Sequence, residues 1–162
     1  MYKWLIFLHI AGTLGFMMAH GASASVAFAL RRERNLERVR ALLELSANSY
    51  GLMYLSLLVL LVSGIVAGFI GQWWGHGWIW TSLALLVAIS VAMTVLGSGI
   101  YGGARKATGL PYFENGKQNP PLESASAEEI EALLAKGNPI LLTVIGSGGL
   151  LLILWLMMFK PF

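Results

Sequence analysis

The stretch from Ala47 to Ile70 reads ANSYGLMYLSLLVLLVSGIVAGFI, and it decides the fold because it contains no Lys, Arg, Asp or Glu. A helix needs about 20 largely apolar residues to cross the roughly 30 Å hydrocarbon core of a bilayer. Three other segments meet the same requirement, at about residues 4–30, 78–101 and 139–159. We therefore expect an all-α bundle of four transmembrane helices, forming one integral membrane domain over residues 1–162.

The composition supports this class. Hydrophobic residues make up 57% of the 162 residues and charged residues only 12%, about half the charged share of a soluble domain. The first apolar stretch is much longer than the core of a signal peptide, so we read it as a retained span. The absence of cysteine excludes disulfides, thiolate metal sites and thiol nucleophiles. No basic run with interleaved aromatics indicates nucleic-acid binding.

The basic residues predict an orientation. The connections at about residues 31–46 and 102–138 hold nine of the eleven Lys and Arg residues, and only Lys3 and Lys160 lie at the opposite side. The positive-inside rule then places both connections in the cytoplasm and both termini outside. The six tryptophans agree, because they all fall at the predicted outer ends of spans, as in an interfacial belt: Trp4, Trp73, Trp74, Trp78, Trp80 and Trp155.

The two connections differ in character. In residues 31–46, apolar residues at helical spacing predict either an extension of the first helix or a short amphipathic helix at the headgroups. In residues 102–138, Asn115-Gly116 and Pro120-Pro121 indicate turns. Ser126 followed by Glu129 is a capping box, which predicts a short amphipathic cytoplasmic helix in this connection. This connection serves either to dock a partner or only to join helices.

Glycines give the predicted spans surfaces for close packing. Gly64 and Gly68 stand at small-xxx-small spacing, and residues 146–149 read Gly-Ser-Gly-Gly. Small residues let helices approach closely in lipid. These surfaces predict a tight bundle, or alternatively a homodimer or a contact within a larger membrane complex. They are not phosphate loops, because they lie within apolar spans and no Lys-Ser/Thr follows them.

The only ionisable side chains inside the predicted spans, apart from tyrosines, are His9 and His20. Eleven helical steps turn the chain about 20° past three full turns, so both imidazoles share one face, about 16 Å apart along the axis. That face also carries small and mildly polar residues, which suits the bundle interior: Gly12, Thr13, Phe16, Ser23 and Ala27. Stacked histidines on a buried helical face are the arrangement by which membrane proteins hold b-type haem, and imidazole is a common metal ligand.

A six-coordinate haem needs a second axial ligand. For His9 the candidates are His76 in the outer loop, or Met157 and Met158; for His20 they are Met93 or Met53. Five-coordinate haem, or a ligand shared across a dimer, would also serve. The competing interpretation is that each histidine bonds a neighbouring carbonyl or hydroxyl and contributes only to packing.

The opening Tyr2-Lys3-Trp4-Leu5-Ile6-Phe7-Leu8-His9-Ile10-Ala11-Gly12 resembles the start of a family of small bacterial four-helix membrane proteins of unknown function. Residues 30–34 and the terminal Lys160-Pro161-Phe162 extend that resemblance. The family is distantly similar to the copper-resistance D membrane domain and to haem-binding protoporphyrinogen oxidase membrane proteins. The resemblance to these two groups covers only the first helix, and implies His9 as a haem or copper ligand. It also implies a bacterial inner-membrane location.

Three functions remain open at this point. The leading hypothesis is a membrane protein that binds haem b or a metal through His9 and His20 and works with a membrane redox complex. The second is a structural or accessory subunit without a cofactor, packed against partner helices. The third is a membrane enzyme that acts on a porphyrin or a quinone. The chain lacks intramembrane carboxylates and an HExxH motif, which disfavours proton relays and hydrolysis.

Overall fold

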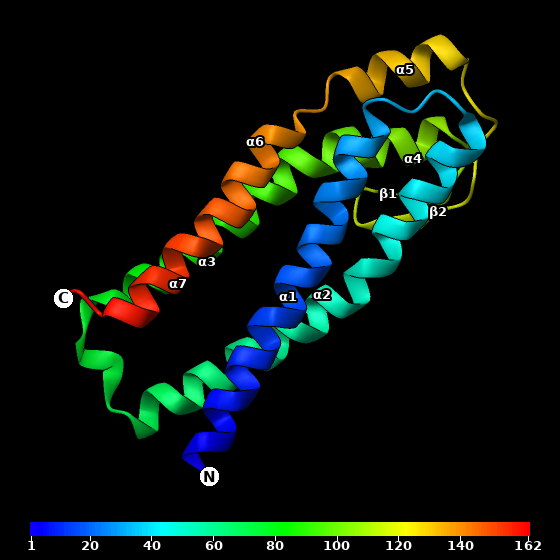
Figure 1. Ribbon diagram of the computed structural model, residues 1–162. Helices are drawn as coiled ribbons and strands as arrows, with labels where there is room; N and C mark the ends of the chain where they lie inside the picture. The colour runs from blue at the N-terminus through cyan, green and yellow to red at the C-terminus, as the bar shows by residue number, and fades with distance from the viewer.

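The computed structural model describes residues 1–162, except for the side chain of residue 98. Four helices are long and apolar enough to cross a membrane, as predicted: Tyr2–Leu30, Leu36–Ile70, Gly77–Ala107 and Pro139–Phe159. The protein is thus an all-α, multi-pass membrane protein. Figure 1 shows both termini at the end of the bundle opposite the 102–138 connection. Which end faces the cytoplasm stays a prediction from the charges.

The helices form two pairs. α1 (Tyr2–Leu30) packs along α2 (Leu36–Ile70), and α3 (Gly77–Gly97) packs along α7 (Gly149–Phe159). The two pairs separate toward the end of the bundle that carries the termini, where the 3₁₀ turn Trp73–Gly75 joins α2 to α3 (Figure 1). A cavity lined by residues of α1, α2, α3 and α7 lies between the two pairs.

The third and fourth spans each contain a π-helical segment. In the third, Ser98–Gly102 joins α3 to α4 (Gly103–Ala107). In the fourth, Val144–Gly148 joins α6 (Pro139–Thr143) to α7. A single π turn inside a helix shifts the residues that follow around the axis, and such turns are frequent at functional sites. The one in the fourth span includes Gly146, which contacts His20.

Residues 31–46 form neither an extension of the first helix nor a separate short amphipathic helix at the headgroups. The chain is non-helical only between Leu30 and Leu36, and α2 begins at Leu36, with the Asn35 side chain accepting a hydrogen bond from the Arg38 amide at 3.1 Å. The helical spacing of the apolar residues was read correctly, but the helix belongs to the second span. An Asn cap satisfies an otherwise free amide of the first turn, so it starts a new helix there.

The 102–138 connection folds back onto the helix ends. It contains a hairpin of β1 (Tyr112–Glu114) and β2 (Lys117–Asn119), followed by α5 (Ala127–Ala135). Asn115 and Gly116 both have positive φ, 54° and 74°, as a tight hairpin turn requires. The Ser126 hydroxyl accepts from the Glu129 amide and starts α5 at the expected place. A core at this end joins α1, α2, α4 and α5: Val26, Leu30, Val39, Leu43, Ala104, Ile130 and Leu134.

Aromatic side chains hold the opposite end together. The Trp73 ring lies 6.3 Å from Tyr2 and 5.7 Å from Trp78, between ring centroids. The Lys160 ammonium group sits 4.6 Å from the centre of the Trp73 ring, and the Trp78 amide donates to the Phe162 carbonyl at 3.2 Å. The start of the chain, the 71–77 turn and the C-terminal residues are therefore joined by one aromatic cluster.

Candidate functional site

The face of α1 that the sequence predicted to point into the bundle is the face that the structure buries. Gly12, His20 and Ala27 are buried, and His9, Thr13 and Ser23 are half-buried. The two histidines nevertheless contact different helices. His9 lies against α2, whereas His20 lies against the fourth span. The shared face is real, but it does not bring the two rings to one partner.

His9 is fixed by the backbone of α2. Its Nδ1 lies 2.9 Å from the carbonyl oxygen of Leu60. Since a carbonyl only accepts, Nδ1 carries the proton in this bond, and in the neutral tautomer with the proton on Nδ1 the Nε2 atom is an acceptor. Gly64 provides the space for the ring, because a Cβ there would lie 2.8 Å from Cε1 and 2.9 Å from Nδ1. Within the described chain, Nε2 has no hydrogen-bond partner.

A cavity of about 130 Å³ lies beside His9, between the two helix pairs. Its walls come from α1, α2, the 71–77 turn, α3 and α7, and they are almost entirely apolar. Met157, one of the candidate second ligands, lines this cavity together with His9. The fold therefore brings these two residues, from the first and last spans, to one cavity.

The other candidate ligands lie elsewhere. His76 is exposed in the turn and stacks on Trp78 at 6.5 Å between ring centroids; it is not among the residues that line the cavity. Met93 is half-buried on α3. What covers the ring of His20 is the backbone of Gly146, so closely that a Cβ at that position would overlap Nε2 and Cε1.

His20 is buried, and its Nε2 has no hydrogen-bond partner among the described residues. The ring fills the space that the missing side chain of Gly146 leaves. This contact closes the approach to Nε2 from the fourth span. A haem iron needs open space at the ligating nitrogen, so the arrangement around His20 does not fit a haem.

The cavity beside His9 fits a small group better than a macrocycle. Pockets for drug-sized ligands have volumes of about 300–1,000 Å³, and this one measures about 130 Å³. No set of three or more His, Asp or Glu side chains that could hold a metal ion gathers within the described part of the chain. The cavity residues that could ligate a metal ion are His9, through its imidazole, and Met17 and Met157, through their thioethers.

Met17 and Trp74 are among the cavity residues that the sequence did not indicate. Met17 lines the cavity from α1, and Trp74 lines it from the 3₁₀ turn. The indole Nε1 of Trp74 is buried without a hydrogen-bond partner among the described residues. The tryptophan was read only as part of an interfacial belt. No sequence pattern shows that its ring lies against Gly68, where a Cβ would meet it at 3.3 Å.

Comparison with protein-family models, with curated proteins and with solved structures finds no match to this chain.

Proposed function

We propose that this membrane protein binds a metal in the cavity beside His9, with His9 Nε2 as the first ligand and Met157 as the second. The observation that carries the proposal is the hydrogen bond from His9 Nδ1 to the Leu60 carbonyl. Metal-ligating histidines almost always donate their other ring N–H to a carbonyl or a carboxylate, which fixes the tautomer and aims the free nitrogen. In His9 this hydrogen bond, from Nδ1 to the Leu60 carbonyl, is already present.

The donor set indicates the kind of metal. Thioether sulfur is a soft ligand that favours copper(I), and imidazole nitrogen also suits copper, whereas magnesium, calcium and manganese prefer oxygen ligands. The small volume favours a single ion over haem b. A bound redox ion in this position would support electron transfer with a membrane redox complex.

The proposal is tested by loading the purified full-length protein with copper(I) and measuring bound metal after desalting. We expect one ion per chain, lost in His9→Ala and weakened in Met157→Leu. His20→Ala is the matched control, since His20 lies on the same helix but against Gly146. Equal loss in both histidine variants, or binding unchanged in His9→Ala, would refute the assignment. An optical spectrum of the protein from haem-replete cells tests haem in parallel.

Gly64 gives a second test that leaves every donor atom in place. Gly64→Ala pushes the His9 ring away from its present position, because the new Cβ would meet Nδ1 and Cε1 at under 3 Å. Gly51→Ala on the same helix meets nothing within 4 Å and serves as the control. We expect metal binding to fall in the first variant and to persist in the second.

A specific observation favours one other candidate, a quinone headgroup. The Trp74 N–H is an unpartnered donor, and His9 Nε2 is an unpartnered acceptor within the described chain; both residues line the same apolar cavity. A hydroquinone offers a hydroxyl to Nε2 and an oxygen to the indole. The test is an organic extract of the purified protein. Two results together would favour this candidate: a copurified quinone that is lost in Trp74→Phe, and no copper binding by the wild type. A preparation with neither ligand would favour a structural subunit.

A further inference from the structure

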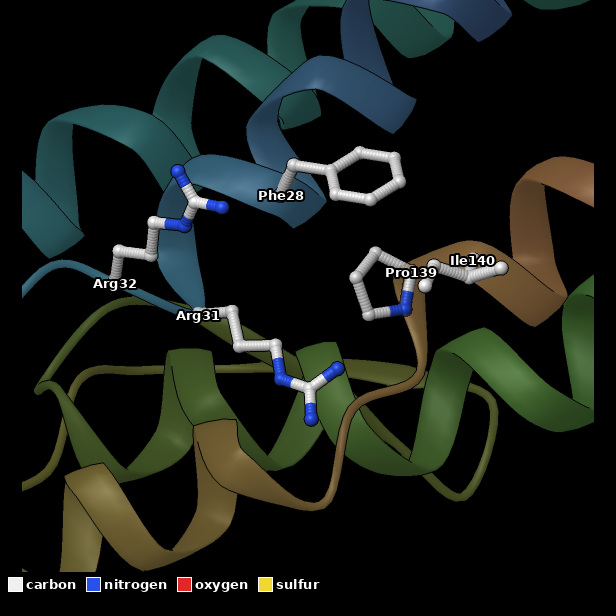
Figure 2. Close-up of a pocket in the computed structure, with 5 residues that line it drawn as sticks. All are labelled: Phe28, Arg31, Arg32, Pro139 and Ile140. Atoms are coloured by element: carbon white, nitrogen blue, oxygen red, sulfur yellow. The ribbon is translucent and has the colours of Figure 1, made fainter.

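The second pocket lies at the opposite end of the bundle from the His9 cavity. It has a volume of about 300 Å³ and is lined by five residues: Phe28, Arg31, Arg32, Pro139 and Ile140. Figure 2 shows that Phe28 comes from the last turn of α1, that Arg31 and Arg32 follow directly after this helix, and that the last two residues come from the start of α6. The pocket therefore sits where the apolar part of the first span stops and the fourth begins.

The arginines near this pocket differ in whether they have an acidic partner. Between residues 31 and 40, Arg34 pairs with Glu131 at 2.9 Å, Arg40 pairs with Glu37 at 2.7 Å, and Arg38 lies 4.0 Å from Glu33. Arg31 and Arg32 have no acidic partner within 4 Å in the described part of the chain. These two unpaired guanidinium groups are the ones that border the pocket.

The remaining walls are apolar. Phe28 is 43% exposed and Ile140 is 60% exposed, although both are large and hydrophobic. Pro139, which also lines the pocket, is fully buried. Positive charge at the span boundary beside an exposed apolar wall is complementary to a phospholipid, whose phosphate lies at the headgroup level and whose chains lie in the hydrocarbon.

We propose that this pocket binds one anionic phospholipid, with its phosphate held by Arg31 and Arg32 and its glycerol and upper acyl chain against Phe28 and Ile140. Guanidinium groups bind phosphate oxygens through paired N–H donors. A zwitterionic lipid offers the same phosphate, but it adds a cationic amine that two arginines disfavour. The selectivity is therefore for a headgroup of net negative charge.

The experiment measures lipid adducts on the full-length protein by native mass spectrometry in detergent, with added phosphatidylglycerol or phosphatidylcholine. We expect one retained phosphatidylglycerol per chain and weaker retention of phosphatidylcholine. The double variant Arg31→Gln/Arg32→Gln should bind phosphatidylglycerol about thirty-fold more weakly, as the loss of two interfacial arginines implies. The matched control is Arg38→Gln, which removes a charge from the same segment outside the pocket.

Since arginine loss can also disturb membrane orientation, a second variant keeps both arginines. Ile140→Glu places a carboxylate at the pocket, where it should pair with the guanidinium groups and exclude the lipid phosphate. Inorganic phosphate at millimolar concentration should not displace the lipid, because it makes no apolar contact. Equal retention of the two lipids, equal weakening by Arg38→Gln, unchanged binding in Ile140→Glu, or displacement by inorganic phosphate would each overturn the proposal.

Discussion

The ring of His20 in the first span lies directly on the backbone of Gly146 in the π-helical segment of the fourth span. No side chain larger than a hydrogen fits between them, so the two residues determine how closely these spans approach. Two features that looked unrelated in the sequence, an intramembrane histidine and a glycine-rich string, are thus parts of one contact.

Gly146→Ala should destabilise the protein by about 1–3 kcal/mol, the usual cost of overpacking a close contact. The control is Gly148→Ala, two residues further along, where a Cβ meets nothing within 4 Å. Thermal unfolding in detergent measures both. Adding His20→Ala to Gly146→Ala should recover part of the loss; strictly additive effects would contradict the direct contact.

The pairing of α1 with α2 depends on Gly12. A Cβ there would lie 2.9 Å from the Leu60 amide nitrogen and 3.0 Å from the Ser56 carbonyl oxygen. Because both are backbone atoms, they cannot rotate away, and the helices must separate. We expect Gly12→Ala to cost about 2 kcal/mol or more. Gly21→Ala, on the same helix but in open space, should leave the unfolding midpoint nearly unchanged.

Arg105 lies in α4, at the end of the third span, and anchors the chain that follows it to α2. Its guanidinium group donates to Glu44 at 2.9 Å and to the Pro111 carbonyl at 2.8 Å, and its side chain is only 20% exposed. Arg105→Gln should cost about 2 kcal/mol, since it leaves these acceptors partly unsatisfied. Arg34→Gln breaks the exposed pair with Glu131 and should change stability by less than about 1 kcal/mol. Proteolysis of the connection provides a second measurement, with faster cleavage expected only in Arg105→Gln.

The stability of the protein should depend on pH through Glu33, which lies in the turn between α1 and α2. Amide hydrogen bonds from Asn35, at 3.0 Å, and Arg34, at 2.9 Å, hold the pKa of the Glu33 carboxyl below its ordinary value of 4.5. A lowered pKa means that the stabilisation is fully present above the ordinary pKa and is lost as pH falls through the lower, folded-state value. The unfolding midpoint of the wild type should therefore exceed that of Glu33→Gln near neutral pH, and the difference should shrink in acid. A difference that is independent of pH would contradict this role.

The sequence by itself determined the four apolar helices, the helical start at Ser126, the turn at Asn115-Gly116 and the inward face of α1. Each of these features depends on hydropathy, capping or periodicity within a few helical turns. The order of neighbouring residues is therefore enough to predict it. The same local reasoning went wrong at residues 31–46, because charges there suggested a connection and the Asn35 cap was not recognised as the start of α2.

Only the tertiary structure decided what the two histidines contact. Leu60 and Gly64 meet His9, Gly146 covers His20, and Met157 joins His9 at one cavity. These contacts link residues more than fifty positions apart, and they depend on the rotation of each helix about its axis and on a π turn in the fourth span. The hydrophobic pattern of a lipid-embedded helix is nearly uniform around its axis, so it does not specify that rotation; close packing of glycines does.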